Sequence, residues 1–343
     1  ICIVFATALL ACALLTGCGA AKEDNLSQGI ALVEQMDYEG ALTCFEAAAL
    51  NKEDMRQVYR GQGLAYMGMT DYENAAASFE KALGQSSPRP DAMDYDINYY
   101  LATAYYRNGQ VDKAIHVYQA ITDLKPGEKT AWYLKGTMEL EQGSTDAAKA
   151  DFDKAVEDAP NDYDIRIDIC SCSKYGQDDL GKSYLENVLD GDRKRISDFD
   201  LGRISYYLGD YEQARTSLEK AQENGGAEAA SLLGQTYEAL GDYNYAASVY
   251  NTYLQNKTPD ASLYNQLGLC KLKGGDYEAA LAAFQAGLEV EGNTATQSLM
   301  FNELVAYEYL GQYDKAKLAM DQYLALYPDD EKAQREAVFL QTR

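Results

Sequence analysis

Residues capable of acid–base or nucleophilic chemistry are sparse in this chain. It has 343 residues but a single histidine, His116, with no second histidine to act beside it and no cysteine nearby. A general base needs a group that orients it, and a zinc site needs several ligands at short spacing. We therefore interpret His116 as a surface or packing residue. We predict no catalytic nucleophile, no phosphate-binding loop and no cofactor, so the protein is expected not to be an enzyme.

Acidic residues form two groups whose spacing weakly resembles a calcium loop. One is Asp162, Asp164 and Asp168, and the other is Asp190 and Asp192. A calcium loop also needs a glycine at its sixth position and an acidic residue at its twelfth, and neither group has them. We interpret both groups as solvated acidic turns.

The cysteines give no sign of a metal site either. Of the seven, four lie beyond residue 18: Cys44, Cys170, Cys172 and Cys270. Cys170 and Cys172 are two residues apart on a predicted helix, so they point to nearly opposite faces and cannot easily pair. The spacings of zinc ligands are missing. We predict small packing residues and expect no metal.

The first seventeen residues have the character of a secretory signal. Residues Ile1–Leu15 are apolar and uncharged, and the run is shorter than the roughly 20 residues of a membrane span. The segment ends in Leu15-Thr16-Gly17-Cys18, which resembles the bacterial lipobox. The resemblance implies a diacylglyceryl group on the Cys18 thiol, cleavage before Cys18, and a bacterial protein outside the cytoplasmic membrane. We expect a charged region to precede residue 1. The alternative is an ordinary signal peptide in which Cys18 is accidental.

A recurring phrase organises the rest of the chain. Tyr-x-x-Ala-x-x-x-Phe-x-x-Ala returns, with variations, about nine times at about 34-residue spacing, with clear copies at Tyr38, Tyr72 and Tyr277. A fixed period of this length indicates an array of small units, each packed on its neighbours. The units are predicted to start at residues 22, 56, 95, 129, 163, 195, 227, 261 and 297.

The units resemble the tetratricopeptide repeat, a helix–turn–helix of 34 residues. Trp132 stands at the family's tryptophan position, which places it in the core. The resemblance implies an all-α fold, a right-handed α-solenoid superhelix of about nine repeats with a C-terminal capping helix. A small residue stands where the first helix of each unit must approach the second: Gly29, Gly63, Ala102, Gly136, Cys170, Gly202, Gly234 and Gly268.

The predicted organisation has four parts. They are a signal peptide over residues 1–17, a lipidated cysteine with a short tether over 18–24, the repeat array over 25–330 and the capping helix over 331–343. A longer loop is expected at residues 86–90, where the spacing between repeats grows. The fifth repeat is degenerate, because Gly181, Leu185 and Val188 replace the expected Ala, Phe and Ala. We therefore predict a weak joint near residues 180–195.

The groove of this family is lined by the first helices, at repeat positions 2, 5, 9 and 12. Aromatic residues and isolated cations gather there in repeats two to six, and the later repeats place Ser231, Gln235, Glu238, Asn265 and Leu269 at these positions. Tyrosine and arginine supply interface hot spots, although many of the 29 tyrosines could simply pack between helices. The Lys/Asn carboxylate clamp of some relatives is missing. The predicted partner-binding residues are Arg60, Tyr99, Tyr106, Tyr133, Phe199, Arg203 and Tyr206.

The net charge of −24 argues against nucleic acid as a partner, because phosphate binding needs clustered Lys and Arg. The acidity serves solubility or steers basic partners. Two functions are compatible with these observations. The first is a non-catalytic scaffold, held by lipid on Cys18 at the extracytoplasmic face of a bacterial membrane, that binds extended segments of partner proteins or assembles an envelope complex. The alternative is a structural lipoprotein associated with the cell wall or with glycan.

Overall fold

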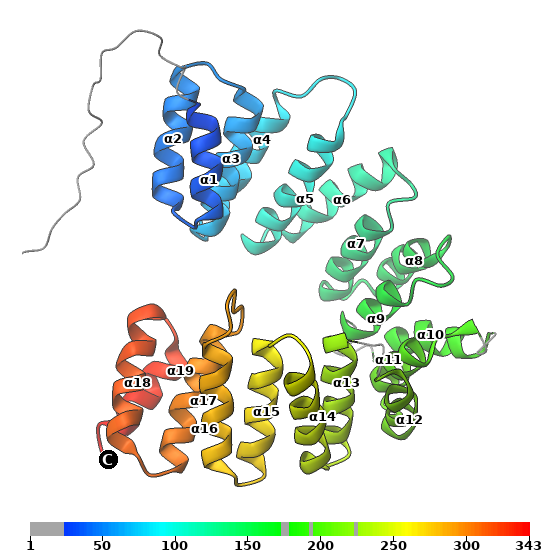
Figure 1. Cartoon of the computed structure of the whole chain (residues 1–343). Helices are drawn as coiled ribbons and strands as arrows, with labels where there is room; N and C mark the ends of the chain where they lie inside the picture. Colours follow the sequence, from blue (N-terminus) through cyan, green and yellow to red (C-terminus); the bar gives the residue numbers. More distant parts are fainter. Residues whose placement is uncertain (1–23, 173–177, 192–194, 223–225) are drawn as a thin grey trace, which may run out of the picture. The chain divides into compact units, whose positions relative to one another are not determined.

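The computed structural model describes residues 24–172, 178–191, 195–222 and 226–343. Within them the chain forms nineteen α-helices and no β-strand (Figure 1). The predicted signal peptide, Cys18 and nearly all of the tether lie outside these residues. The chain divides into two compact units, unit 1 up to Ala155 and unit 2 from Val156.

Unit 1 consists of four helix pairs. The helices are α1 (Asn25–Glu34), α2 (Tyr38–Leu50), α3 (Met55–Gly68), α4 (Tyr72–Leu83), α5 (Ala92–Arg107), α6 (Val111–Leu124), α7 (Lys129–Glu141) and α8 (Thr145–Val156). Odd-numbered helices are the first helices of the repeats, hereafter A-helices, and even-numbered ones are the second, hereafter B-helices. The longer connection expected around residues 86–90 is present between α4 and α5.

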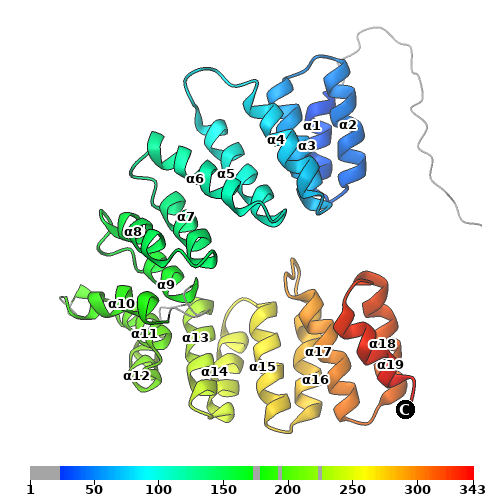
Figure 2. The same cartoon turned by 180° about the vertical axis from the view of Figure 1, so that it is seen from behind.

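Unit 2 consists of five further pairs and a final single helix (Figure 2). They are α9 (Tyr163–Cys172), α10 (Asp178–Leu189), α11 (Asp198–Leu208), α12 (Tyr211–Ala221), α13 (Gly226–Ala239), α14 (Tyr243–Asn256), α15 (Ala261–Lys273), α16 (Tyr277–Leu288), α17 (Thr296–Tyr309), α18 (Tyr313–Leu326) and α19 (Glu331–Leu340). The last helix, α19, buries Ala333 and Leu340 against α17 and α18. It covers the apolar end of the array, as the sequence predicts for a capping helix.

The turns between the A- and B-helices that the structure describes follow from two adjacent residues. The first has a positive φ, as Gly275 does at 81°, and the second is commonly an aspartate that caps the B-helix. The Asp276 carboxylate accepts the backbone N–H of Ala279, which would otherwise lack a partner at the helix N-terminus. The other aspartates that cap B-helices in this way are Asp37, Asp71, Asp210 and Asp242.

Glycines let the two helices of a repeat approach closely. A Cβ atom on Gly63 of α3 would lie 2.4 Å from the ring of Phe79 on α4, which is fully buried. One on Gly61 would lie 2.3 Å from the ring of Phe45 on α2, so this Gly-x-Gly sequence serves helix packing. The B-helix alanines that complete these contacts are fully buried as well: Ala41, Ala75, Ala148, Ala214, Ala246, Ala280 and Ala316.

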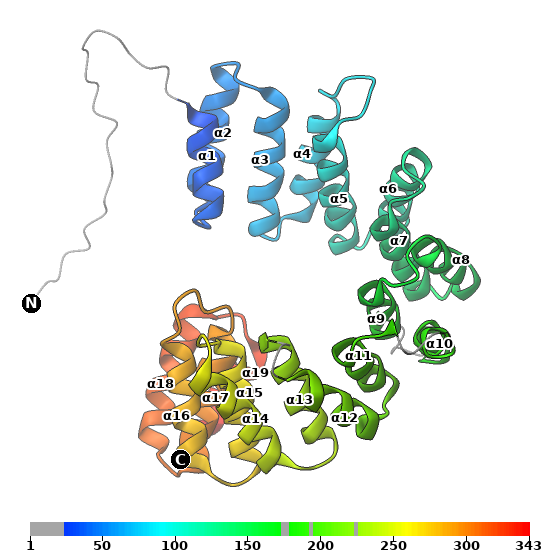
Figure 3. The ribbon, with the colours of Figure 1, turned by 45° about the vertical axis from the view of Figure 1, so that its right-hand side comes forward.

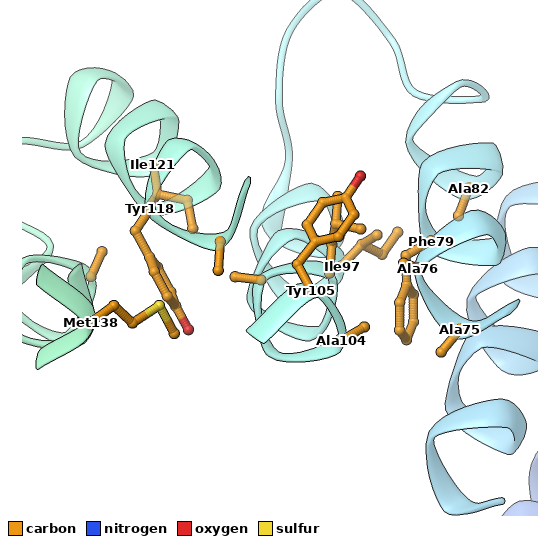
Figure 4. Close-up of a cluster of buried hydrophobic side chains, with 14 residues drawn as sticks. Ala75, Ala76, Phe79, Ala82, Ile97, Ala104, Tyr105, Tyr118, Ile121 and Met138 are labelled. Atoms are coloured by element: carbon orange, nitrogen blue, oxygen red, sulfur yellow. The ribbon is translucent and has the colours of Figure 1, made fainter. Parts of the chain in front are cut away.

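A buried core cluster of unit 1 extends from repeat two to repeat four. Figure 4 shows Phe79 of α4 facing Ile97 and Tyr105 of α5, followed by Tyr118 of α6 and Met138 of α7. All five side chains are buried. Because each layer packs on the next, stability is shared between neighbours and does not come from one central core.

The A-helices lie closer to one another than the B-helices do. In unit 1, α3 contacts both α1 and α5, helices that Figure 3 shows in sequence order. In unit 2, α9, α11, α13, α15 and α17 contact each other successively. Contacts of similar extent between successive B-helices are missing from the described residues. Side chains on the A-helices of one unit therefore converge on a shared face.

Two expectations need comment. Trp132 is half-buried and not in the core, because its indole N–H reaches outward and donates to the Pro126 carbonyl at 2.7 Å.

The boundary between the two compact units falls between Ala155 and Val156, whereas the sequence predicts a weak joint near residues 180–195. That joint stays a prediction, and residues 192–194 within it lie outside the described part of the chain.

Candidate partner-binding surfaces

The seven predicted partner-binding residues fall into two groups. Unit 1 carries Arg60 on α3, Tyr99 and Tyr106 on α5, and Tyr133 on α7. These four residues are called the tyrosine row. Unit 2 carries the remaining three, all on α11: Phe199, Arg203 and Tyr206. All seven side chains are partly buried.

Arg60 in the tyrosine row is not an isolated cation, contrary to the prediction. Its Nε donates to the Asp96 carboxylate on α5 at 2.6 Å, and its guanidinium carbon lies 5.8 Å from the centroid of the Tyr100 ring. The arginine therefore joins α3 to α5. Any ligand of Arg60 has to share it with this carboxylate.

Two tyrosines of the row are engaged in helix packing. The Tyr99 ring lies 5.9 Å from that of Tyr118, and the Tyr133 ring lies 6.3 Å from that of Phe152. Burial, and then the negative charge of Glu128, raise the pKa of Tyr99 well above its usual value. These rings therefore lie between the A- and B-helices of their own repeats. This is the packing role that the sequence left open for many of the tyrosines.

Tyr106 bridges two repeats at the surface. Its hydroxyl donates to the Glu141 carboxylate at the end of α7, with oxygen–oxygen distances of 2.8 and 2.9 Å. This hydrogen bond is the largest influence raising the pKa of Tyr106, and burial adds to it. Tyr106 therefore joins α5 to α7 through its hydroxyl.

Arg203 is the centre of a charged cluster in unit 2. Its Nη2 lies 2.5 Å from the Asp164 Oδ1 of α9, and its Nε lies 3.5 Å from the Glu228 Oε1 of α13. Asp200 follows at 3.6 Å on α11 itself. The Arg203 side chain is only 15% exposed, whereas those of Asp164 and Glu228 are 74% and 66% exposed. The surface of the cluster therefore presents carboxylates to solvent.

The other two α11 residues support this cluster. The Phe199 ring lies under the guanidinium, with its centroid 5.4 Å from the Arg203 Cζ. The Tyr206 hydroxyl donates to the Gln235 Oε1 of α13 at 3.3 Å, and its ring packs on Tyr207 and Tyr211. Burial is the main reason that the pKa of Tyr206 is raised.

A pocket of about 300 Å³ opens beside Arg203, between α11, α13 and α15. It is called the α13 pocket. Leu232 and Leu263 form its apolar part. The sequence analysis did not identify the α15 side, because Asp260, which caps α15, and Ser262 belong to no pattern that marks a binding site. The charged and polar residues that line the pocket are Arg203, Glu228, Ser231, Gln235, Asp260 and Ser262.

Hydrogen bonds and ion pairs between successive A-helices recur along both units. Lys273 on α15 contacts Glu238 on α13 at 3.0 Å, and the Asn302 amide on α17 donates to Asn265 on α15 at 2.8 Å. Together these contacts are called the A-side ladder. Its other members are Arg56–Asp94, Arg60–Asp96, Tyr106–Glu141, Arg203–Asp164, Arg203–Glu228 and Tyr206–Gln235.

One motif escaped the sequence analysis. Residues 176–183 have the letters Gly-x-x-x-x-Gly-Lys-Ser of a phosphate-binding loop. That loop needs its second glycine and lysine at the start of a helix that follows a strand. Here Gly181, Lys182 and Ser183 lie inside α10, which begins at Asp178, and the Ser183 hydroxyl donates back to the Leu180 carbonyl at 2.7 Å. Asp179 would also repel phosphate. The match carries no nucleotide-binding function.

The remaining candidate groups are dispersed. His116 is exposed on α6, and Cys170 is buried while Cys172 is half-buried on α9. In the part of the chain that the structure describes, no three or more His, Cys, Asp or Glu residues come together as a metal site. The described helices also include none that is both long and apolar enough to cross a membrane.

Comparison with protein families agrees with this geometry. Models described as tetratricopeptide repeat match residues 26–90, 99–163, 199–262 and 232–298, and a second such model matches residues 305–330. These matches cover more than half of the sequence, and the chain belongs to the tetratricopeptide repeat family. The predicted all-α repeat fold is confirmed.

Solved structures are similar in fold. Yeast Tom70 is 14% identical, with a TM-score of 0.54, over 94% of this chain and 82% of that one. A tetratricopeptide repeat protein from Parabacteroides merdae is 15% identical, with a TM-score of 0.44, over 74% of this chain and 98% of that one. Comparison with curated proteins finds no match. At this level of identity the likeness to Tom70 is one of fold alone.

Proposed function

We propose that this chain is a non-catalytic scaffold that binds extended segments of partner proteins, or assembles an envelope complex, through its A-helix faces. We further propose that lipid on Cys18 anchors it to the extracytoplasmic face of a bacterial membrane. The observation that carries the binding role is the recurrence of partly buried aromatic, charged and amide side chains at equivalent A-helix positions. Members of the tetratricopeptide repeat family present such faces to protein or peptide partners.

The spacing of the A-helices favours an extended ligand. Packed helices lie on the order of 10 Å apart, which corresponds to about three residues of extended chain. A partner segment that runs across the A-helices therefore meets an equivalent set of side chains at regular intervals. Tyr106 and Arg203 supply the aromatic and cationic anchors that interfaces commonly use, although each already has a partner within the chain.

The anchor is supported by the lipobox-like residues that end at Cys18. Only residues 19–24 separate this cysteine from α1, a reach of at most about 20 Å. The array is therefore proposed to work close to the bilayer.

Replacement of the anchor cysteine tests this part. Cys18→Ala is expected to leave the precursor unprocessed or to release the protein from the membrane fraction, and Cys44→Ala, within α2, is the matched control. Membrane fractionation and the mobility of the protein on gels are the measurements. If Cys18→Ala fractionates and migrates like the wild type, the lipid anchor is refuted.

Crosslinking in intact cells tests the binding part. Tyr106→Ala removes an exposed A-side contact and is expected to lower recovery of crosslinked protein partners about tenfold. His116→Ala, on the exposed surface of α6 in the same repeat, is the control. Recovery unchanged by Tyr106→Ala would place binding elsewhere on the molecule. Recovery of glycan in place of protein would support the structural-lipoprotein alternative.

A further inference from the structure

One repeat position that carries a tyrosine in unit 1 carries a small side chain beside the α13 pocket in unit 2. Gly136 of α7 and Gly234 of α13 occupy the same register, since each lies against the aromatic ring of its own B-helix. Three residues before them stand Tyr133 and Ser231. The Tyr133 ring fills the space beside the Phe152 ring in unit 1. In unit 2 the position belongs to Ser231, which lines the α13 pocket.

The lining of the pocket suits a long side chain with a polar end. Leu232 and Leu263 are themselves buried and supply apolar contact. Glu228 and Asp260 place carboxylates at the same pocket, beside the hydroxyl of Ser231. Arginine and lysine side chains combine an aliphatic stem with a cationic head and make both kinds of contact.

Arg203 lines the same pocket and pairs with Glu228 at 3.5 Å, but other carboxylates share its charge. The Asp164 carboxylate at 2.5 Å and the Asp200 carboxylate at 3.6 Å already surround it, in addition to Glu228. One guanidinium thus faces several acidic groups, and it is the least exposed of the ion-paired side chains in the cluster. The local charge at the pocket is negative, in agreement with the net charge of −24. A cationic ligand is therefore favoured and an anionic one is repelled.

We propose that the α13 pocket binds the side chain of an arginine or lysine from an extended partner segment. The proposal rests on the function proposed above and adds the chemical class of the segment: it is basic. The Glu228 and Asp260 carboxylates hold the cationic head, while Leu232 and Leu263 contact the stem. The α13 pocket thus selects the partner by charge.

The test uses the full chain in mild detergent and three labelled dodecapeptides. The first has arginine at every third position in an uncharged background. The second replaces each arginine with citrulline, which keeps the shape and removes the charge, and the third replaces it with glutamate. Fluorescence polarisation is expected to show the arginine peptide binding about tenfold more tightly than the citrulline peptide, with weaker binding as salt rises.

Three variants connect this binding to the pocket. Ser231→Tyr fills the pocket with the side chain that the same position carries in repeats three and four. Glu228→Gln removes one charge while keeping the shape of the side chain. Each is expected to weaken the arginine peptide about tenfold and to leave the citrulline peptide unchanged. Glu331→Gln, on the exposed surface of α19, removes one charge elsewhere and is the control.

The outcomes separate this inference from the proposed function. The pocket proposal is overturned if the arginine and citrulline peptides bind equally. It is also overturned if both pocket variants bind the arginine peptide as tightly as the wild type does. In either case the proposed peptide-binding function still stands. If none of the three peptides is bound, the inference and the peptide-binding function both fail. Circular dichroism of each variant shows whether the fold is kept. If Ser231→Tyr does not fold, the affinity of Glu228→Gln for the arginine peptide tests the pocket by itself.

Discussion

Unit 1 and unit 2 use the same A-helix positions in different ways. In unit 1 the large rings of Tyr99 and Tyr133 pack against their own B-helices. In unit 2 the equivalent Ser231 has no ring and lines the α13 pocket beside Arg203. The comparison teaches that an aromatic residue on a predicted groove is as much a sign of packing as of binding.

The largest effect is expected from overpacking unit 1. Ala75→Leu inserts a bulky side chain at a fully buried contact between α3 and α4 and is expected to cost about 2–3 kcal/mol of unfolding free energy. Ala150→Leu, on the exposed side of α8, is the control. Hydrogen exchange is expected to quicken over several repeats of unit 1 and not in unit 2. Equal loosening of both units would show that they unfold as one.

Tyr133→Ser makes the tyrosine row resemble the α13 pocket. Loss of the ring contact with Phe152 is expected to lower the unfolding free energy by about 2 kcal/mol, as measured by urea unfolding. Tyr245→Ser, at a side chain that is 61% exposed on α14, is expected to cost less. If the two variants lose the same amount, Tyr133 is not a packing residue and the comparison between the units fails.

Each unit also contains a carboxyl group whose pKa is raised to about 7. In unit 1 burial, and then the Asp151 carboxyl, raise the pKa of Glu139 against the opposing charge of Lys135. In unit 2 burial, and then the negative charge of Glu336, raise the pKa of Glu308. The folded protein binds these protons more tightly than the unfolded chain does. Stability from this source is therefore present below about pH 4.5 and is lost as pH rises to about 7.

Glutamine substitution measures this pH dependence in each unit separately. Glu139→Gln or Glu308→Gln is expected to stabilise the protein by on the order of 1 kcal/mol at about pH 8, with no gain near pH 4.5. Chemical unfolding across this pH range is the measurement, and Glu73→Gln on the exposed face of α4 is the control. A gain that is the same at every pH would contradict the titration of these groups.

The smallest stability change is expected for Ser231→Tyr. The equivalent position accommodates tyrosine in unit 1, so filling the α13 pocket is expected to change the unfolding free energy by less than about 1 kcal/mol in either direction. Thermal unfolding is the measurement. A loss as large as that of Ala75→Leu would show that the pocket cannot accept a ring, and that the two units differ in backbone geometry as well as in side chains.

The helix pairs were predictable because their determinants are local and repeated. A small residue such as Gly63, a buried Phe79 and a capping Asp71 each act within one repeat, so the period alone places them. The ion pairs formed by Arg60 and Arg203 were not predicted. Arg60 and Asp96 are 36 residues apart, and Arg203 and Asp164 are 39 apart, so each pair joins neighbouring repeats. The α13 pocket is lined by side chains from three repeats, so no single repeat unit predicts it.

The A-side ladder has a mechanical consequence. Its contacts lie on the A-helix side of each unit. Bending that moves the A-helices apart stretches these contacts, whereas bending that moves the A-helices together does not. Stiffness is therefore unequal in the two directions. Rungs made by ion pairs, such as Arg203–Asp164, soften as salt rises, while the uncharged Tyr206–Gln235 rung does not. A unit pulled at its ends would thus act as a spring whose compliance depends on ionic strength.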